Sequence, residues 1–216
     1  MNIKNEMNFK NDTIMKKVLI LVMAAMMSVG MMAEGFEGVA CRDGQASYHW
    51  NKWLDYINIV EPLNIHEYET IYLCTPDISK VQWPEKSDNK YPALEQSLKA
   101  FPSILAKSIK KKLPGINVRT VNSIDEMKLD DKSLGICLRF EELDMGEMSL
   151  RVWVGAGAGA QKITLSGVIF DKDKNEKFDY RHRRVTVLGR SYKKDLQLEF
   201  ANFGHDIAKM LTELSK

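Results

Sequence analysis

Two stretches of the chain place apolar residues at the spacing of an α-helix. The first runs from Leu94 to Ile109 and repeats apolar residues at i, i+4, i+7, i+11 and i+15. The second is one continuous apolar stripe formed by Leu196, Phe200, Phe203, Ile207, Leu211 and Leu214. Pro102 lies inside the first stretch, so either that helix kinks or a new helix begins with Pro102 in its first turn. The pattern therefore predicts two main amphipathic helices.

Five other stretches have the alternation or the β-branched and aromatic content of strands. They are residues 69–75, 116–121, 133–143, 163–169 and 178–189. The charged turn "DKDKNEK" joins the last two into the clearest hairpin of the chain. The order β–α–β–β–β–β–α predicts an α+β fold. We expect a single, mostly antiparallel or mixed sheet of about five strands with the two helices packed on it.

The segment before these elements is expected to lie outside the sheet. Residues 34–68 are predicted to be an N-terminal lead-in to a single α+β domain over residues 69–216. The lead-in carries a short helical stripe made of Trp50, Trp53, Leu54 and Ile57. Such a stripe usually packs on its own domain. The alternative is that Trp50 and Trp53 form a surface for a partner or for a membrane.

The first residues of the chain have the composition of a secretory signal. Residues 15–33 begin with two lysines, continue as an uncharged apolar run and end on small residues. The apolar run is too short to favour a membrane-spanning helix. We therefore expect residues 1–33 to be a signal peptide, with residues 15–33 as its core and cleavage after Ala33. An uncleaved anchor is the alternative, and the start is either Met1 or Met15.

The charge of the chain gives no support for a nucleic-acid partner. The full sequence has a net charge of +2, but four lysines and two acidic residues belong to residues 1–33. The 27 basic and 27 acidic side chains of the remaining chain balance, and they form no basic stripe. We expect no nucleic acid among its partners.

Three cysteines follow the signal segment. Cys74 and Cys137 lie in apolar strand-like stretches, so we expect them to be small buried hydrophobic residues. The third, Cys41, ends the sequence "GVAC", whose small residues are typical of a lipidation site, although Gly38 replaces the usual large aliphatic residue. Lipid on Cys41 would anchor the protein to a membrane. Export also permits one disulfide, and the sequence leaves its two partners open.

The stretch "RVWVGAGAGAQKITLSG", residues 151–167, alternates alanine with Gly155, Gly157 and Gly159. A dinucleotide-binding loop needs Gly-x-Gly-x-x-Gly between a strand and a helix, because the helix N-terminus holds the pyrophosphate. Here the spacing is different and the next element is a strand. We therefore predict that the three glycines shape the backbone where the sheet bends or crosses over, and that they bind no anion.

The turn "DKDKNEKFDYRH" resembles a calcium-binding loop at its first three oxygen positions, Asp171, Asp173 and Asn175. However, Glu176 stands where that loop needs glycine, and His182 stands where it needs a bidentate glutamate. A polar hairpin turn is the simpler interpretation, with a weak surface cation as the alternative.

The remaining ionisable residues match no catalytic or metal-binding motif. In the strand that contains "RHRR", alternation sends Arg181 and Arg183 to one face, and His182 and Arg184 to the other. The histidines are scattered, at His49, His66, His182 and His205. We predict no catalytic residue, no metal site and no cofactor, and therefore no enzyme.

Several stretches together resemble a known family. They are "ETIYLCTPD", "SILAKSIKKKL", "LGICLRFEELDMG", "VGAGAGAQKITLSGVIFDKDKNEKF" and "FANFGHDIAKMLTEL". They are similar to domain of unknown function family 4410, an uncharacterised bacterial envelope family, over residues 69–214. In that family a glycine-rich stretch precedes a strand that carries an aspartate. The matching residues are Gly155, Gly157, Gly159, Asp171 and the closing-helix residues Ile207 and Leu211.

The resemblance has implications for fold and location. The family is similar in plan to the N-terminal domain of TolB and to periplasmic domains of the curli secretion channel. This implies one sheet with flanking helices, working in the periplasm or at the outer membrane by binding other envelope components. The family supplies no catalytic residues, and this chain departs from it in lacking a clear lipidation box around Cys41.

These observations lead to one functional hypothesis and two alternatives. The leading hypothesis is an exported, non-enzymatic envelope protein of a Gram-negative bacterium that binds a protein or another surface component. One alternative is an exported hydrolase or enzyme inhibitor with a cleft near the loop of Trp83 and the glycine–alanine segment. The other is a subunit of a symmetric assembly, held together through Trp50 and Trp53. The sequence leaves the oligomeric state open.

Overall fold

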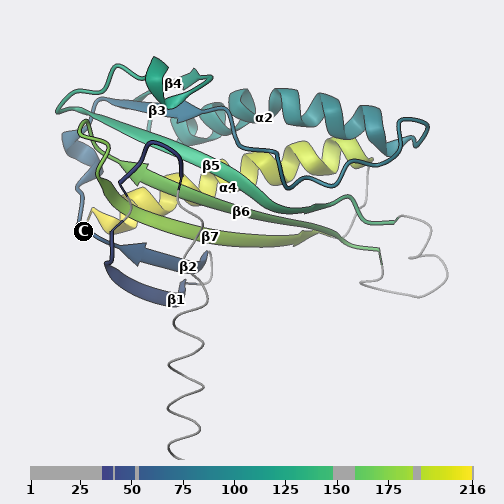
Figure 1. Ribbon diagram of the computed structural model, residues 1–216, viewed down its shortest axis with the longest axis horizontal. Coiled ribbons are helices and arrows are strands. Elements are labelled where there is room, and N and C mark those ends of the chain that lie inside the picture. The colour runs from purple at the N-terminus through teal and green to yellow at the C-terminus, as the bar shows by residue number, and fades with distance from the viewer. Residues whose placement is uncertain (1–35, 41, 52–53, 148–158, 187–190, 216) are drawn as a thin grey trace, which may run out of the picture. The chain divides into compact units, whose positions relative to one another are not determined.

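A seven-stranded mixed sheet forms one layer of the fold, and two long helices cover one of its faces (Figure 1). The computed structural model describes residues 36–40, 42–51, 54–147, 159–186 and 191–215, except the side chains of residues 49–51. The strands are β1 Gln45–Asn51, β2 Leu54–Ile59, β3 Thr70–Cys74, β4 Asn117–Val121, β5 Ser133–Asp144, β6 Gln161–Phe170 and β7 Glu176–Thr186. The helices are α2 Lys90–Lys112 and α4 Tyr192–Leu214, with short 3-10 turns η1 Ile65–Glu67 and η2 Ile124–Glu126.

The order of strands across the sheet is β1-β2-β7-β6-β5-β3-β4. Strand β3 runs parallel to both β4 and β5, and the remaining neighbours are antiparallel. Helix α2 is the crossover between the parallel strands β3 and β4, as such a connection requires. The predicted α+β class, with a single mixed sheet and two main helices, is confirmed.

The sheet has seven strands rather than about five, because residues 45–59 form the hairpin β1–β2. The predicted helical stripe over Trp50 to Ile57 is therefore wrong. Aromatic and β-branched residues also favour strands, and tertiary pairing decides between the two patterns. Strand β2 pairs with β7, placing Ile57 beside Tyr180 with both side chains buried in the core.

Both helices bury the faces predicted from their sequences. Leu94, Leu98, Phe101, Leu105 and Ile109 of α2 all belong to the main core. Helix α2 continues through Pro102 as one element. Helix α4 begins at Tyr192 and is capped by Ser191, whose side chain accepts a hydrogen bond from the backbone N–H of Lys194. The helices meet closely at Gly204, where an added Cβ would lie 2.7 Å from the Cβ of Ser108.

The opposite face of the sheet is covered only in part by apolar residues. Near β3 and β5, the side chains of Phe36, Cys74, Cys137, Val168 and Phe170 form a second apolar cluster. The N-terminal segment that contains Phe36 crosses the sheet here, and Ala40 forms a bridge with Asn175 (Figure 1). Elsewhere this face carries polar and charged side chains together with the exposed Tyr48 and Val185. We call it the open face.

Gly159 lies where the connection from β5 returns to the sheet just before β6. Its φ is +67°, and an added Cβ would lie 1.9 Å from the carbonyl oxygen of Glu147. We expect Gly159→Ala to lower the free energy of unfolding by about 1–3 kcal/mol, because alanine meets both backbone strain and a steric clash. Urea denaturation measures the effect.

Gly115 provides the matched control for this substitution, because an added Cβ there has nothing within 4 Å. Gly115→Ala should leave stability unchanged or raise it slightly, by less than about 1 kcal/mol. Equal stabilities of the two variants would show that the backbone at Gly159 does not require glycine.

Candidate functional site

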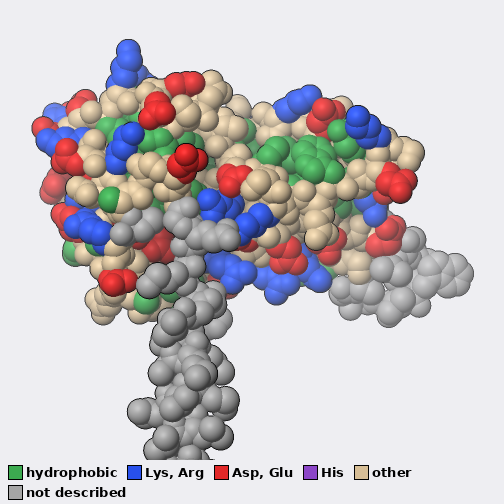
Figure 2. Space-filling model, in the orientation of Figure 1, with side chains coloured by type: hydrophobic (Ala, Val, Ile, Leu, Met, Phe, Trp, Pro, Cys, Tyr) green, Lys and Arg blue, Asp and Glu red, His purple; other side chains and the backbone are tan. Residues whose placement is uncertain are grey.

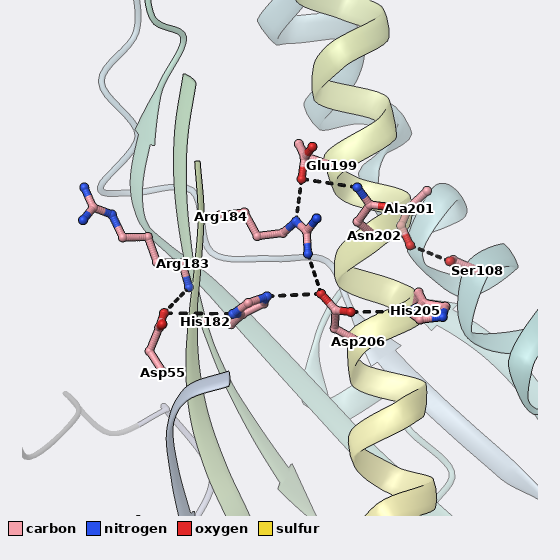
Figure 3. Close-up of polar contacts among 10 residues, drawn as sticks. All are labelled: Asp55, Ser108, His182, Arg183, Arg184, Glu199, Ala201, Asn202, His205 and Asp206. Atoms are coloured by element: carbon pink, nitrogen blue, oxygen red, sulfur yellow. Dashed lines mark hydrogen bonds and ion pairs between the residues drawn. The ribbon is translucent and has the colours of Figure 1, made fainter. Parts of the chain in front are cut away.

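The largest group of interacting ionisable residues that the structure describes lies between β7 and α4 (Figure 3). Alternation along β7 points His182 and Arg184 toward the helices, and Arg181 and Arg183 toward the open face. This arrangement is the one that the sequence predicts. From the opposite side, Glu199 and Asp206 of α4 face the sheet. We call His182, Arg184, Glu199 and Asp206 the ionic cluster.

Asp206 is at the centre of the ionic cluster. One of its carboxylate oxygens, Oδ2, lies 3.1 Å from Nε2 of His182 and 2.7 Å from Nη1 of Arg184. The other oxygen, Oδ1, lies 3.3 Å from Nδ1 of His205. Arg184 also donates a hydrogen bond from Nε to Glu199, so that one guanidinium bridges two carboxylates on the same helix. The cluster therefore fastens the last long strand to the last helix.

The ionic cluster is largely removed from solvent. His182 is 6% exposed, Glu199 is 4% exposed and Asp206 is 3% exposed. Nδ1 of His182 lies 4.0 Å from Asp55 and has no hydrogen-bond partner among the described residues. The ring of His182 instead packs edge-on against Phe203, with 5.4 Å between the ring centroids. On the side of helix α4, the imidazole therefore contacts both the ring of Phe203 and the carboxylate of Asp206.

The environment lowers the pKa of Asp206. Burial by itself raises this pKa, but hydrogen bonds from His182 and His205 and the positive charge of Arg184 outweigh burial. The carboxylate is therefore ionised over the whole physiological pH range, and it gives the partly buried Arg184 a counter-charge.

A histidine beside an aspartate is also the arrangement of a general base and the residue that orients it. Here, however, the pair is buried between sheet and helix, and Arg184 occupies the same carboxylate oxygen. A hollow of about 350 Å³ lies elsewhere, lined by η1 and by the end of α2, including His66, Tyr68 and Lys112. This hollow contains neither His182 nor a cysteine. The geometry of the ionic cluster is therefore that of a structural contact that holds α4 against β7.

The lowered pKa of Asp206 makes the stability of the protein pH-dependent. An aspartate whose pKa is lower in the folded state stabilises the fold above its unfolded pKa, near 4, and this contribution is lost as pH falls further. We expect Asp206→Asn to be less stable than the native chain at pH 7, by about 1–2 kcal/mol. The difference should shrink as the pH falls from about 4 to about 2.

Urea denaturation at several pH values measures this dependence. Asp173→Asn, in the exposed β6–β7 turn, is the control and should keep the native dependence on pH. Parallel curves for the native chain and for Asp206→Asn would contradict the assigned role of Asp206.

Comparison with known proteins identifies the family. A family model described as "Domain of unknown function (DUF4410)" matches residues 71–212. The chain belongs to the DUF4410 family. The resemblance inferred from its sequence is thereby confirmed, and the matched residues run from β3 to α4, so they include the whole ionic cluster.

No curated protein matches the chain. Among solved structures, the DUF4410 chain is similar to a PelC dodecamer from Paraburkholderia phytofirmans, with 10% identity and a TM-score of 0.46 over 79% of this chain and 98% of that one. A variant PelC dodecamer from the same organism has 13% identity and a TM-score of 0.44, covering 74% of this chain and 98% of that one. An uncharacterised protein has 12% identity and a TM-score of 0.41, covering 69% and 94%. Likeness at this level carries no information on function or assembly.

Several residues predicted to have a role lie outside the described part of the DUF4410 chain. They are Cys41, Trp53, Gly155 and Gly157. Trp50 belongs to β1, but its side chain is not among those described. Among the three glycines, the structure thus describes Gly159 alone, two residues before β6.

In the calcium-like turn, both carboxylate oxygens of Asp171 have partners within the protein. Oδ1 of Asp171 accepts hydrogen bonds from the backbone N–H groups of Asp173 and Asn175, and Oδ2 lies 3.1 Å from Nζ of Lys177. Among the described residues, no three of His, Cys, Asp and Glu are grouped as metal ligands would be. No helix in the described part of the chain is both long and apolar enough to cross a membrane.

The acidic members of the ionic cluster were missed at the level of sequence. A usable signal was present, because Asp195, Glu199 and Asp206 follow one another at i, i+4 and i+11. That spacing is the spacing of the apolar stripe itself, and all three side chains are buried. Acidic residues that recur with the spacing of an apolar stripe are expected to be buried, and buried carboxylates need cationic partners. The basic residues of "RHRR" could supply them.

Proposed function

We propose that this DUF4410 protein is an exported cell-envelope protein of a Gram-negative bacterium that works by binding another envelope protein. The order of charged, apolar and small residues over 15–33 supports export. The ionic cluster supports a binding role over a catalytic one, since its histidine and carboxylates are buried and paired with one another or with Arg184.

The open face supplies the binding surface in this proposal. Residues directly opposite one another in the sheet form rows that run across its strands. One row continues from Tyr48 through Tyr56 and Arg181 to Ser166 and Arg139. In the next rows, Arg183 lies beside Thr164, and Val185 beside Lys162. Figure 2 shows lysine and arginine side chains gathered over β6 and β7 on this face, with acidic side chains among them.

The observation that best supports the proposal is that these rows expose apolar side chains and an arginine to solvent. Tyr48 is 56% exposed and Val185 is 57% exposed, the two largest values among the exposed large hydrophobic residues that the structure describes. Between them lies Arg181, an exposed residue with no ion pair in the described part of the chain. Tyrosine and arginine are enriched where proteins bind one another.

The positive charge on the open face favours a partner with an acidic surface. Arg139 and Arg183 have acidic neighbours, Asp77 at 2.9 Å and Glu142 at 3.5 Å, whereas Arg181 is available to an incoming group. We therefore assign to this face a protein surface that is acidic and includes apolar residues. Charge complementarity of this kind favours specificity and rapid association.

Fractionation and a charge-reversal variant test the proposal together. The native chain should be found in the periplasm or at the outer membrane. Its intact mass should be that of a chain whose first residue is Glu34. Affinity capture from the envelope fraction should retain an acidic protein that is lost with Arg181→Glu/Arg183→Glu. The partner should persist with Lys110→Glu/Lys111→Glu, which reverses two exposed charges at the end of α2.

Two results would overturn the proposal. One is a chain that stays in the cytoplasm at its full length. The other is a captured partner that is lost equally with both charge-reversal variants, because loss would then reflect net charge and not the open face. If the captured protein is a second copy of this chain, the open face mediates self-assembly and not binding of another envelope protein.

A further inference from the structure

Two cysteines lie side by side on neighbouring strands of the sheet. Strands β3 and β5 are parallel, and their register pairs Leu73 with Ile136. One step further along both strands, Cys74 is opposite Cys137, and both side chains lie on the same face. Both carry free thiols and are 5% exposed. Their side chains are hydrogen-bonded to each other.

The spacing of adjacent strands suits a covalent link between these residues. Neighbouring strands lie about 4.8 Å apart, and disulfides join residues whose Cα atoms are about 4.4–6.8 Å apart. Because the two side chains already share one face and contact each other, closing the bond requires side-chain rotation and no change in the register of the strands.

We propose that Cys74 and Cys137 form a reversible cross-strand disulfide, with a small-molecule disulfide such as oxidised glutathione as the oxidant. The sulfur of one cysteine attacks the reagent, forms a mixed disulfide and releases one glutathione thiol. The sulfur of the second cysteine then attacks the first, forms the internal S–S bond and releases the second glutathione thiol. The protein loses two electrons and two protons, and the reagent gains them.

The environment identifies the cysteine that attacks first. Hydrogen bonding from the Cys137 thiol lowers the pKa of Cys74, whereas hydrogen bonding to Cys74 together with burial raises the pKa of Cys137. The thiolate is the reactive form, so Cys74 forms the mixed disulfide and Cys137 resolves it. Urea below the unfolding midpoint would open the sheet locally and admit the reagent to Cys74, which is the last residue of β3.

The bond would strengthen a particular part of the sheet. Strand β3 joins β4 to the rest of the sheet through its parallel pairing with β5. A covalent link at the end of β3 would prevent separation of these strands, and it would close a long loop that contains the whole of α2. Export would bring the chain into a compartment where such bonds persist.

Oxidation of the purified full chain with Cys41→Ser tests the inference, since this variant has two thiols only. Treatment with oxidised glutathione, in urea below the unfolding midpoint, should remove the mass of two hydrogens. A peptide map should link Cys74 to Cys137. The melting temperature should rise by about 5–15 °C and return to its starting value on reduction with dithiothreitol.

Two further measurements keep the test decisive. With Cys74→Ala or Cys137→Ala in the same background, the internal bond should be absent, and the remaining thiol should stay reduced or keep one glutathione. The native chain should give the same Cys74–Cys137 peptide link, and this measurement needs no variant to fold. A chain that stays reduced, that keeps glutathione without an internal bond, or that links Cys41 to either partner would overturn the inference. None of these results depends on export, so the proposed function stands or falls separately.

Discussion

Replacing Phe200 by alanine is expected to lower the free energy of unfolding by about 3–5 kcal/mol. Phe200 of α4 is fully buried, and its ring centroid lies 4.7 Å from that of Phe101 on α2 and 5.9 Å from that of Phe140 on β5. Its removal leaves a cavity at the point where both helices meet the sheet, and it also removes the edge-to-face contact with Phe101 and the tilted contact with Phe140. Urea denaturation followed by far-UV circular dichroism measures the loss.

Leu198 is the control for this prediction, since it lies on the same helix and is 42% exposed. Leu198→Ala should change stability by less than about 0.5 kcal/mol. A loss of comparable size in both variants would mean that α4 does not pack on the sheet through the face assigned here.

Replacing Arg184 by methionine is expected to cost about 3 kcal/mol of folding stability. The substitution keeps much of the apolar volume of the side chain but leaves two buried carboxylates, Glu199 and Asp206, without their shared cation. Breaking a buried pair is costly for this reason, even where the intact pair contributes little. Replacing Glu199 by glutamine in the same variant should recover part of the loss, because one unpaired charge is removed.

Arg183 provides a close control for Arg184. It is the preceding residue of β7, but its side chain lies on the open face, is 48% exposed and is 3.5 Å from Glu142. Arg183→Met should therefore change stability by at most about 1 kcal/mol. Equal losses from Arg183→Met and Arg184→Met would contradict the assignment of the two faces of β7.

Local periodicity was sufficient to predict most of the fold. The apolar spacing of α2 and α4 predicted the faces that they bury, and alternation in "RHRR" predicted that His182 and Arg184 share one face of the strand, opposite to Arg181 and Arg183. These predictions held because an amphipathic element has one natural way to cover a sheet. The hairpin β1–β2 was mispredicted because four residues at helical spacing in a short stretch also fit strands. Pairing with β7, which lies more than a hundred residues away in sequence, decides the outcome.

The candidate site was less accessible to prediction for a related reason. Neither the partnership of Arg184 with Asp206 nor that of Cys74 with Cys137 leaves a local motif, because each joins elements that are distant in sequence. Burial of Cys74 and Cys137 was predicted from their apolar surroundings, and the structure confirms it. Their position side by side on adjacent strands depends on the parallel register of β3 and β5, which the sequence did not indicate.

We propose above that this DUF4410 protein binds its partner through the open face of the sheet. The most direct measurement is photo-cross-linking in the native cell, with a photoreactive amino acid at Val185 on the open face or at Leu198 on the helix layer. Both positions are exposed, so they differ mainly in the face that they report. We expect an adduct of the chain with a second envelope protein from position 185, and none from position 198. Adducts from position 198 alone, or equal adducts from both positions, would contradict it.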